Sequence, residues 1–336
     1  MDHAYIHNPY FPNADFLKRL KADFEIVMKE YPAGQKSLAQ AMGTAFDLHP
    51  DRLVVANGAS ELIKIVCGHG NATVAVSVPG FNEYENATGA ANLVKVELKA
   101  PSFEFDADAF ISKMKQGRAH MAVVVSPNNP TSLAVPRAKL LKLLSSLEAY
   151  GALLILDESF MEFSDDPAKY SLMDQVPKRR NLVIVKSLSK VYGIAGLRLG
   201  YLYSDNASII NTTRRSLPIW NINGFAESFL RLMPRYRTEF AASCRQVRED
   251  TLELYRALAD IPGGHAYEPQ ANFVFWRLPD SITSDVLVSR LFAEHHMLIK
   301  DCSEKTMREG EHYVRIASRT PDENRALVAA IRGIVG

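Results

Sequence analysis

Strong net charge is absent from this chain of 336 residues, because 39 lysines and arginines offset 38 aspartates and glutamates to leave a formal charge of +1. A chain so balanced carries no long-range field toward nucleic acid or anionic membranes. Long apolar stretches are missing as well, and none approaches the length of a membrane span. The first residues show no basic segment followed by an apolar one, so we expect no secretory signal. We therefore expect a soluble protein without nucleic-acid or membrane partners.

Cysteine is equally scarce, with only Cys67, Cys244 and Cys302 in the chain. An odd number of widely separated cysteines predicts neither a disulfide framework nor a zinc site, and a reducing cytosol is the expected compartment. The pair His295-His296 lacks metal-ligand partners, so no metal is expected. A G-x-G-x-x-G segment before a helix is missing too, which argues against a dinucleotide-binding fold.

Short apolar runs rich in β-branched residues alternate with longer helical patterns. These runs span 52–56, 73–78, 121–125, 152–156, 181–185 and 197–201. Near-continuous apolar strands of this length belong in a sheet that is buried on both faces. Helical segments such as 60–67 and 137–150 separate them. The alternation predicts an α/β fold with a mainly parallel sheet.

The last third of the chain has a different pattern, which suggests a second, smaller α+β unit. One long amphipathic helix is expected over 224–260. The segments that follow are a strand at 271–276, a helix near 284–295, a strand at 312–317 and a final helix from Asp322. We expect an N-terminal arm with a small-domain segment at 1–30, a large domain at 31–260 and a small C-terminal domain at 261–336.

Polar clusters follow four of the predicted strands at their carboxyl ends, where open α/β sheets bind their ligands. The clusters are Asn57-Gly58, Pro127-Asn128-Asn129, Asp157 and Ser187-Leu-Ser-Lys190. Arg198 follows the last cluster by eight residues. A lysine for a Schiff base, an acid for a pyridinium nitrogen and an arginine for a phosphate are what pyridoxal phosphate requires. The pattern therefore predicts a site for that cofactor.

The segment Ser187-Leu-Ser-Lys-Val-Tyr-Gly-Ile-Ala-Gly-Leu-Arg-Leu-Gly-Tyr201 resembles the cofactor-lysine motif of the class I and II aminotransferases, which are fold-type-I pyridoxal phosphate enzymes. The similarity extends from about Asn8 to the C-terminus. Within that superfamily the chain is most similar to the branch that holds histidinol-phosphate aminotransferase and threonine-phosphate decarboxylase. The resemblance implies a large domain with a mainly parallel sheet, a small α+β domain, a small amino-acid substrate and a cytoplasmic homodimer with shared active sites.

The resemblance assigns cofactor roles to several residues. Lys190 would form the Schiff base, Asp157 would pair with the pyridinium nitrogen and Asn129 would donate to the ring O3′. The phosphate would bind at the start of a helix, where backbone N–H groups point toward an anion. The residues implied there are Gly58, Ala59, Ser60, Ser187 and Arg198.

Further residues are implied around the ring and the substrate. Tyr84 would stack on the ring, and Tyr31 would reach the phosphate site of the neighbouring subunit. Asn8 in the N-terminal arm, Asn272 and Arg315 would face the substrate, with Arg315 binding its carboxylate.

Three features are closer to the decarboxylase than to the aminotransferase. Phe160 occupies the position where the aminotransferases have a tyrosine hydroxyl near O3′. Arg319 follows Arg315 by four residues, so on one strand both guanidinium groups would face one pocket. Two such groups suit a substrate with a phosphate and a carboxylate. The segment 79–84 also follows the decarboxylase, whereas 58–61 is closer to the aminotransferase.

We therefore prefer α-decarboxylation of an O-phospho-L-amino acid, such as threonine or serine phosphate. The alternative is an aminotransferase of the histidinol-phosphate type, which moves an amino group between an amino donor and a 2-oxo acid. A transcriptional regulator of the same fold is an alternative from another class, but no basic helix-turn-helix pattern precedes residue 10. The N-terminal arm is shorter than in either enzyme family, which leaves open that the chain is one module of a longer protein.

Overall fold

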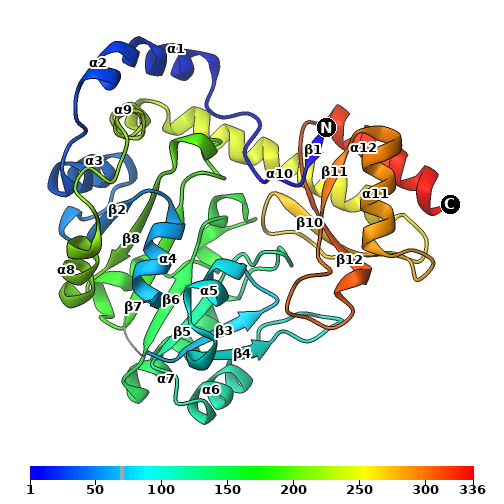
Figure 1. The fold of residues 1–336 in the computed structure, drawn as a ribbon, viewed down its shortest axis with the longest axis horizontal. Helices are drawn as coiled ribbons and strands as arrows, with labels where there is room; N and C mark the ends of the chain where they lie inside the picture. Colours follow the sequence, from blue (N-terminus) through cyan, green and yellow to red (C-terminus); the bar gives the residue numbers. More distant parts are fainter. Residues whose placement is uncertain (69–71) are drawn as a thin grey trace.

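Two β-sheets and their helices form the computed structural model, which describes residues 1–68 and 72–336 (Figure 1). Within these residues, the larger sheet has seven strands in the order β2-β8-β7-β6-β5-β3-β4. They are β2 (Leu53–Ala56), β3 (Val74–Val78), β4 (Leu93–Glu97), β5 (Met121–Val125), β6 (Leu153–Asp157), β7 (Leu182–Ser187) and β8 (Gly200–Ser204). The pairs β4–β3, β3–β5, β5–β6 and β6–β7 are parallel, and β8 is antiparallel to both neighbours. The prediction of a mainly parallel α/β sheet is confirmed.

Helices cover both faces of the larger sheet, which explains why its strands are apolar along their whole length. Leu154 and Leu156 of β6 pack in one core with Leu140, whereas Ile155 packs in a second core with Ile63. Adjacent strand residues point to opposite faces, so each strand contributes to both cores. The helices around this sheet are α3 (Gln35–Phe46), α4 (Ala59–Gly68), α5 (Asn82–Ala87), α6 (Ala107–Gln116), α7 (Arg137–Tyr150), α8 (Ala207–Ser216) and α9 (Gly224–Leu232).

The smaller sheet combines both ends of the chain. Its order is β1-β11-β12-β10-β9, and β1 pairs in parallel with β11. The strands are β1 (Asp2–His3), β9 (His265–Ala266), β10 (Phe273–Arg277), β11 (Leu298–Asp301) and β12 (Tyr313–Ala317). The helices α10 (Arg237–Ala259), α11 (Ser284–His295) and α12 (Pro321–Val335) pack on it around a third core.

An extended arm, residues 4–13, leads from β1 to the larger sheet and its helices, and α1 (Ala14–Ala22) and α2 (Phe24–Lys29) follow it. Phe11 and Phe16 are buried in the main core, and their rings meet edge to face at 5.4 Å. Figure 1 shows the blue N-terminal segment between the two sheets. The arm therefore connects the two sheets across the region where strands β5 to β7 end.

Two predicted elements are wrong in their bounds. The expected helix 224–260 is broken into α9 and α10 by a short 3-10 turn at Met233–Arg235. Pro234 lies in that turn, and a proline lacks the N–H group that a helix interior needs. The strand expected at 197–201 begins only at Gly200, because Arg198 has a left-handed backbone with φ of 55°.

Among the residues that the structure describes, none of the helices is both long and apolar enough to cross a membrane. A search of the same residues finds no cluster of three or more histidine, cysteine, aspartate or glutamate side chains that could hold a metal ion.

Candidate active site

A pocket lies at the carboxyl ends of the central strands, where the sequence predicted it. It brings together the clusters that follow β2, β5, β6 and β7. The residues that line it are Ala59, Ser60, Phe81, Val125, Asn129, Asp157, Ser159, Phe160, Ser187, Lys190 and Arg198. Eight of the predicted cofactor-binding residues are thus neighbours in space, although up to 139 positions separate them in the sequence.

Lys190 is the only amine on the wall of this pocket in the described part of the chain. It follows β7, and its Nζ donates to Ser187 Oγ at 3.3 Å. Burial lowers the pKa of Lys190, and the guanidinium groups of Arg198 and Arg315 lower it further, whereas Asp157 acts in the opposite direction. A lowered pKa makes more of the neutral amine available as a nucleophile.

Asp157 ends β6 and is 3% exposed. Tyr84 donates from its hydroxyl to Oδ2 at 2.8 Å, and the backbone N–H of Ser159 donates to Oδ1 at 3.0 Å. Burial raises the pKa of Asp157, and these hydrogen bonds together with the charge of Lys190 work against the rise. A protonated ring nitrogen next to this carboxylate would supply the charge partner that the buried group lacks.

Phe81 and Phe160 are the aromatic residues on the pocket wall, whereas Tyr84, which the resemblance implied, does not line it. Tyr84 is fully buried on α5, and its hydroxyl donates to Asp157. Its ring packs in the core that contains Ile155 and Ile63. Phe81 precedes α5 and meets Tyr84 edge to face at 6.4 Å. Tyr84 therefore orients the carboxylate, and Phe81 provides the ring that can contact a flat cofactor.

The anion-binding end of the pocket lies where α4 begins. Gly58 has a φ of 81°, and a Cβ there would come within 2.7 Å of Arg198 Nη2. Only glycine lets the backbone approach that guanidinium group so closely. Arg198 itself donates to Ser189 Oγ at 3.3 Å and to the Ala195 carbonyl at 3.4 Å, both neutral oxygen atoms. The helix start, Ser60, Ser187 and Arg198 thus fit a phosphate group.

Arg315 on β12 extends from the smaller sheet to Asn129. Its Nη1 donates to Asn129 Oδ1 at 2.8 Å, and its Nη2 donates to the Ala4 carbonyl at 2.5 Å. The guanidinium carbon lies 5.4 Å from the centre of the Phe273 ring. Burial lowers the pKa of Arg315 to about 10, and its Nε has no hydrogen-bond partner among the described residues. A buried cation whose bonds go to neutral oxygens is suited to an anionic ligand.

Arg319 does not lie on the strand with Arg315, so the prediction that strand periodicity puts both on one face is wrong. The strand β12 ends at Ala317, and Arg319 lies in the link to α12. Its Nη1 contacts the Nε2 atom of His7, and its Nε is 3.7 Å from Glu323 Oε1. His7 was not predicted as a site residue, and its pKa is lowered by burial and by Arg319.

The N-terminal arm is joined to Lys190 and Arg315 through backbone contacts. The N–H of Asn8 donates to the Lys190 carbonyl at 2.9 Å. The Asn8 side chain donates to Val191 O and Ser243 Oγ, so it anchors the arm instead of facing a substrate. Gly193 permits this approach, because a Cβ there would lie 1.9 Å from the Phe11 carbonyl oxygen.

Asn272 lies at the start of β10 beneath the same arm. Its Nδ2 donates to the His7 carbonyl at 3.4 Å, and its Oδ1 is buried with no partner in the described part of the protein. An unpaired buried acceptor costs free energy unless a ligand or water donates to it. This position is consistent with the substrate-side role that the resemblance implied.

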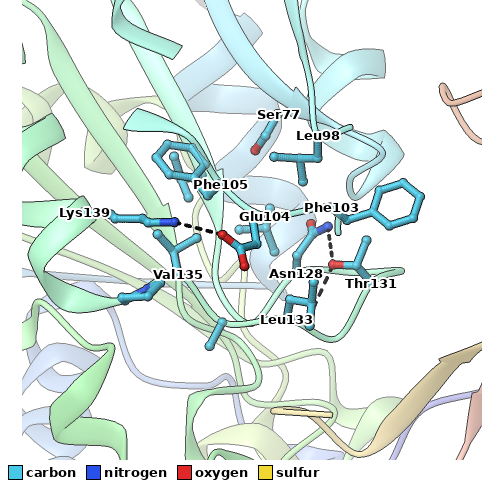
Figure 2. A pocket seen from close by; sticks show the side chains of 14 residues that line it. Ser77, Leu98, Phe103, Glu104, Phe105, Asn128, Thr131, Leu133, Val135 and Lys139 are labelled. Carbon is cyan, nitrogen blue, oxygen red and sulfur yellow. Dashed lines mark hydrogen bonds and ion pairs between the residues drawn. The ribbon is translucent and has the colours of Figure 1, made fainter. Parts of the chain in front are cut away.

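A second cavity of about 230 Å³ is lined by Asn128 and Thr131, among others (Figure 2). Phe103 and Phe105 contribute to its walls, and Lys139 bonds to Glu104 at 3.4 Å. Asn128 donates to Thr131 Oγ1 at 3.0 Å and thereby holds the turn in place. Val125 borders both cavities, but Lys190, Asp157 and Arg198 line only the first.

Tyr31 is far more exposed than the rest of the predicted site, with 75% of its surface accessible. It stacks on Trp220 with ring centres 4.1 Å apart. Phe24, Ile26, Met28 and Ile219 are also exposed. Tyr31 is not among the residues that line the pocket of its own chain. This is the position expected of a residue that serves a neighbouring subunit.

Comparison with known proteins gives consistent matches. Residues 28–331 match the family model described as aminotransferase class I and II. The chain is 43% identical over 336 residues to the CMP-5′-(3-aminopropyl)phosphonate synthase of Streptomyces rubellomurinus, covering 100% of this chain and 53% of that protein. It is 31% identical to the L-serine phosphate decarboxylase of Sulfurospirillum multivorans, covering 100% and 88%.

A solved structure of a decarboxylase from Sulfurospirillum multivorans has a TM-score of 0.88 at 30% identity, covering 100% of this chain and 95% of that one. The chain spans about half the length of the Streptomyces relative.

Proposed function

The chain belongs to the class I and II aminotransferase family of pyridoxal phosphate enzymes, and from that membership we propose that it removes the α-carboxyl group of an amino acid whose side chain ends in a phosphorus oxyanion. Serine and threonine phosphate are the expected substrates, and a phosphonate analogue would present similar oxygens. We place the reaction in the cytosol, as the few scattered cysteines suggest.

The names of two relatives support α-decarboxylation of an amino acid that bears a phosphorus oxyanion. One decarboxylates serine phosphate. The other is named for an aminopropylphosphonate, a compound with an amine and a phosphonate but no carboxylate. Such a product has the composition that α-decarboxylation of a phosphonate amino acid would leave. Both names therefore combine a phosphorus oxyanion with an amine.

We assign each of the following residues a separate role in the proposed reaction. Bound pyridoxal phosphate supplies an electron sink for the bond that breaks. Asp157 holds a negative charge for the ring nitrogen, and Tyr84 keeps that carboxylate in position. Arg315 would bind the carboxylate of the substrate and so orient its α-carbon, and Lys190 would exchange a proton at Nζ. The N-terminal arm excludes water from this side of the pocket.

The substrate side also includes Arg319, which we propose acts through the arm. Its guanidinium group touches the His7 ring, and the His7 carbonyl accepts from Asn272. Glu323 already provides Arg319 with a counter-charge. Arg319 would therefore hold the arm closed over the substrate, and Asn8 would fix its inner end.

Transamination of the histidinol-phosphate type remains the second candidate. The segment 58–61 favoured it in the sequence, but Glu61 only bonds to the Asn57 backbone N–H at 2.7 Å and to Asn221 at 2.9 Å. These two hydrogen bonds hold the segment 57–61 at the start of α4, which would serve either reaction. Phe160 lines the pocket without a hydroxyl and packs against Phe273, which agrees with the decarboxylase comparison made from the sequence.

Product analysis tests the choice of reaction. The protein loaded with pyridoxal phosphate is incubated with O-phospho-L-serine or O-phospho-L-threonine, and carbon dioxide and keto acid are measured separately. We expect carbon dioxide and a phosphorylated amine in equal amounts. Keto acid that forms only with an amino acceptor, with no carbon dioxide from either compound, would reverse the assignment.

We also propose a homodimer in which Tyr31 enters the partner's phosphate site. The exposed apolar side chains around Tyr31 and Trp220 provide the surface for this contact. Tyr31→Ala is expected to weaken cofactor retention by about 10-fold, since a charge-assisted hydrogen bond is lost. Tyr150→Ala, at an exposed tyrosine that ends α7, is the matched control and should retain the cofactor. A fully active monomer in sedimentation would contradict the proposal.

A further inference from the structure

Lys305 carries a positive charge from the smaller sheet to the turn before α5. It lies in the loop 302–309 between β11 and β12, which reaches toward β3 and β4 in Figure 1. Its Nζ donates to the Gly80 carbonyl at 2.9 Å and to Asn82 Oδ1 at 2.5 Å. These two residues flank Phe81, which lines the pocket. The ammonium group is therefore held at the turn that carries Phe81.

The loop that carries Lys305 is fixed on both sides of it. Thr306 donates from its hydroxyl to Glu85 Oε2 at 2.9 Å, and Arg308 lies 3.7 Å from Glu97. Glu85 also pairs with Lys95 at 2.9 Å, so its charge is already neutralised. The position of Lys305 is thus set by the surrounding contacts.

The charge of Lys305 has no counter-ion within the described part of the protein. None of the ion pairs there involves Lys305, Lys300 or Arg315. Burial, with smaller contributions from Arg315 and Lys300, lowers the pKa of Lys305 to about 8, although Cys302 and Glu85 act in the opposite direction. Both of its hydrogen bonds go to neutral oxygens, and an ammonium group has a third N–H to donate.

Arg315 lies on β12, and in the sequence it stands between Lys305 and Arg319. Lys300 of β11 pairs with Arg315 across the ladder, so the loop after β11 lies beside the start of β12. Arg319 lies beyond the other end of β12 and already has Glu323. A ligand with one anionic group on Arg315 could place a second anionic group near Lys305 or near Arg319. Of these two, only Lys305 lacks a counter-ion among the described residues, because Arg319 already has Glu323.

We propose that Lys305 binds the phosphorus oxyanion of the substrate side chain and so selects phosphorylated over plain amino acids. This inference rests on the proposed function, and it names the residue that recognises the substrate class. A phosphate dianion next to Lys305 would neutralise an ammonium charge that lacks a counter-ion, while the carboxylate of the same substrate binds Arg315.

Spectral titration of the cofactor-loaded protein with O-phospho-L-serine and with L-serine tests the inference without depending on turnover. We expect the wild type to bind phosphoserine more tightly. Lys305→Met should weaken phosphoserine binding by about 10- to 100-fold and leave L-serine binding unchanged. Lys305→Arg should restore most of the preference. Lys115→Met removes the charge of an exposed lysine on α6 and is the matched control, with no change for either ligand.

The pH dependence separates recognition from a merely structural contact. Phosphoserine binding to the wild type should weaken as the pH rises through about 8, because Lys305 loses its proton there. Lys305→Met should lack that inflection. Equal weakening of phosphoserine, L-serine and cofactor binding would show that Lys305 only holds the loop, and a wild type without preference for phosphoserine would also overturn the inference. Keto acid as the product would reject decarboxylation but leave this preference to be judged from the same titration.

Discussion

Lys190→Ala is expected to abolish the covalent attachment of pyridoxal phosphate and to lower activity by at least about 10⁴-fold, the upper range for a positioned acid–base group. Lys190 is the amine on the wall of the pocket, and burial together with two guanidinium groups lowers its pKa. No other described lysine lines that pocket, so no neighbour can replace it. Borohydride reduction followed by peptide mapping measures the attachment directly.

Lys186 provides the internal control for this mapping. It lies four residues earlier, on β7, where it is 6% exposed and forms an ion pair with Glu162. The label should therefore appear on Lys190 and not on Lys186. A Lys190→Ala variant that still carries reducible cofactor would show that the lysine is wrongly assigned.

Arg315→Gln should have the second largest effect. Removing one partner of a desolvated charge pair costs roughly 2–5 kcal/mol, so kcat/KM for the substrate is expected to fall by about 100-fold or more. The cofactor should remain bound, because its phosphate would be held by the α4 start, Ser187 and Arg198. Steady-state kinetics and the cofactor absorbance measure the two effects independently.

Thermal stability is the control measurement for the Arg315→Gln variant. Burial lowers its pKa, which means that the folded chain disfavours the charged form. Glutamine removes that charge and can still donate to Asn129 or to the Ala4 carbonyl, so Tm should be unchanged or higher. Arg319→Gln should reduce kcat/KM by less, since Arg319 acts through His7 and already has Glu323. Equal losses in both variants would favour the two-arginine pocket that the sequence suggested.

The sequence by itself determined the larger sheet and the inner part of the site. Parallel strands that are buried on both faces have to be apolar throughout, so these apolar runs could be identified from the sequence alone. The polar residues that follow them necessarily meet at one edge of the sheet. Asn129, Asp157 and Lys190 are therefore brought together by a rule that depends only on where each strand ends.

Some errors in the helices and strands had local causes that the sequence already contained. Pro234 interrupts the helix expected over 224–260, and the lack of an N–H group would have shown the break. Arg319 follows β12 by two residues, and Pro321 at the start of α12 marks the end of the strand. Period-two reasoning fails there because it holds only while the strand continues.

Only the tertiary structure decided which residues surround the site from outside the sheet. Phe81 and Tyr84 are three residues apart, and the turn before α5 determines which ring faces the pocket. His7 and Lys305 come from an arm and a loop whose paths depend on packing between the two sheets. Such contacts join segments distant in the chain, and no periodicity of the sequence records them. The sequence thus specified the cofactor chemistry, whereas the proposed selection of a substrate by Arg315 and Lys305 would depend on how the smaller sheet packs against the larger one.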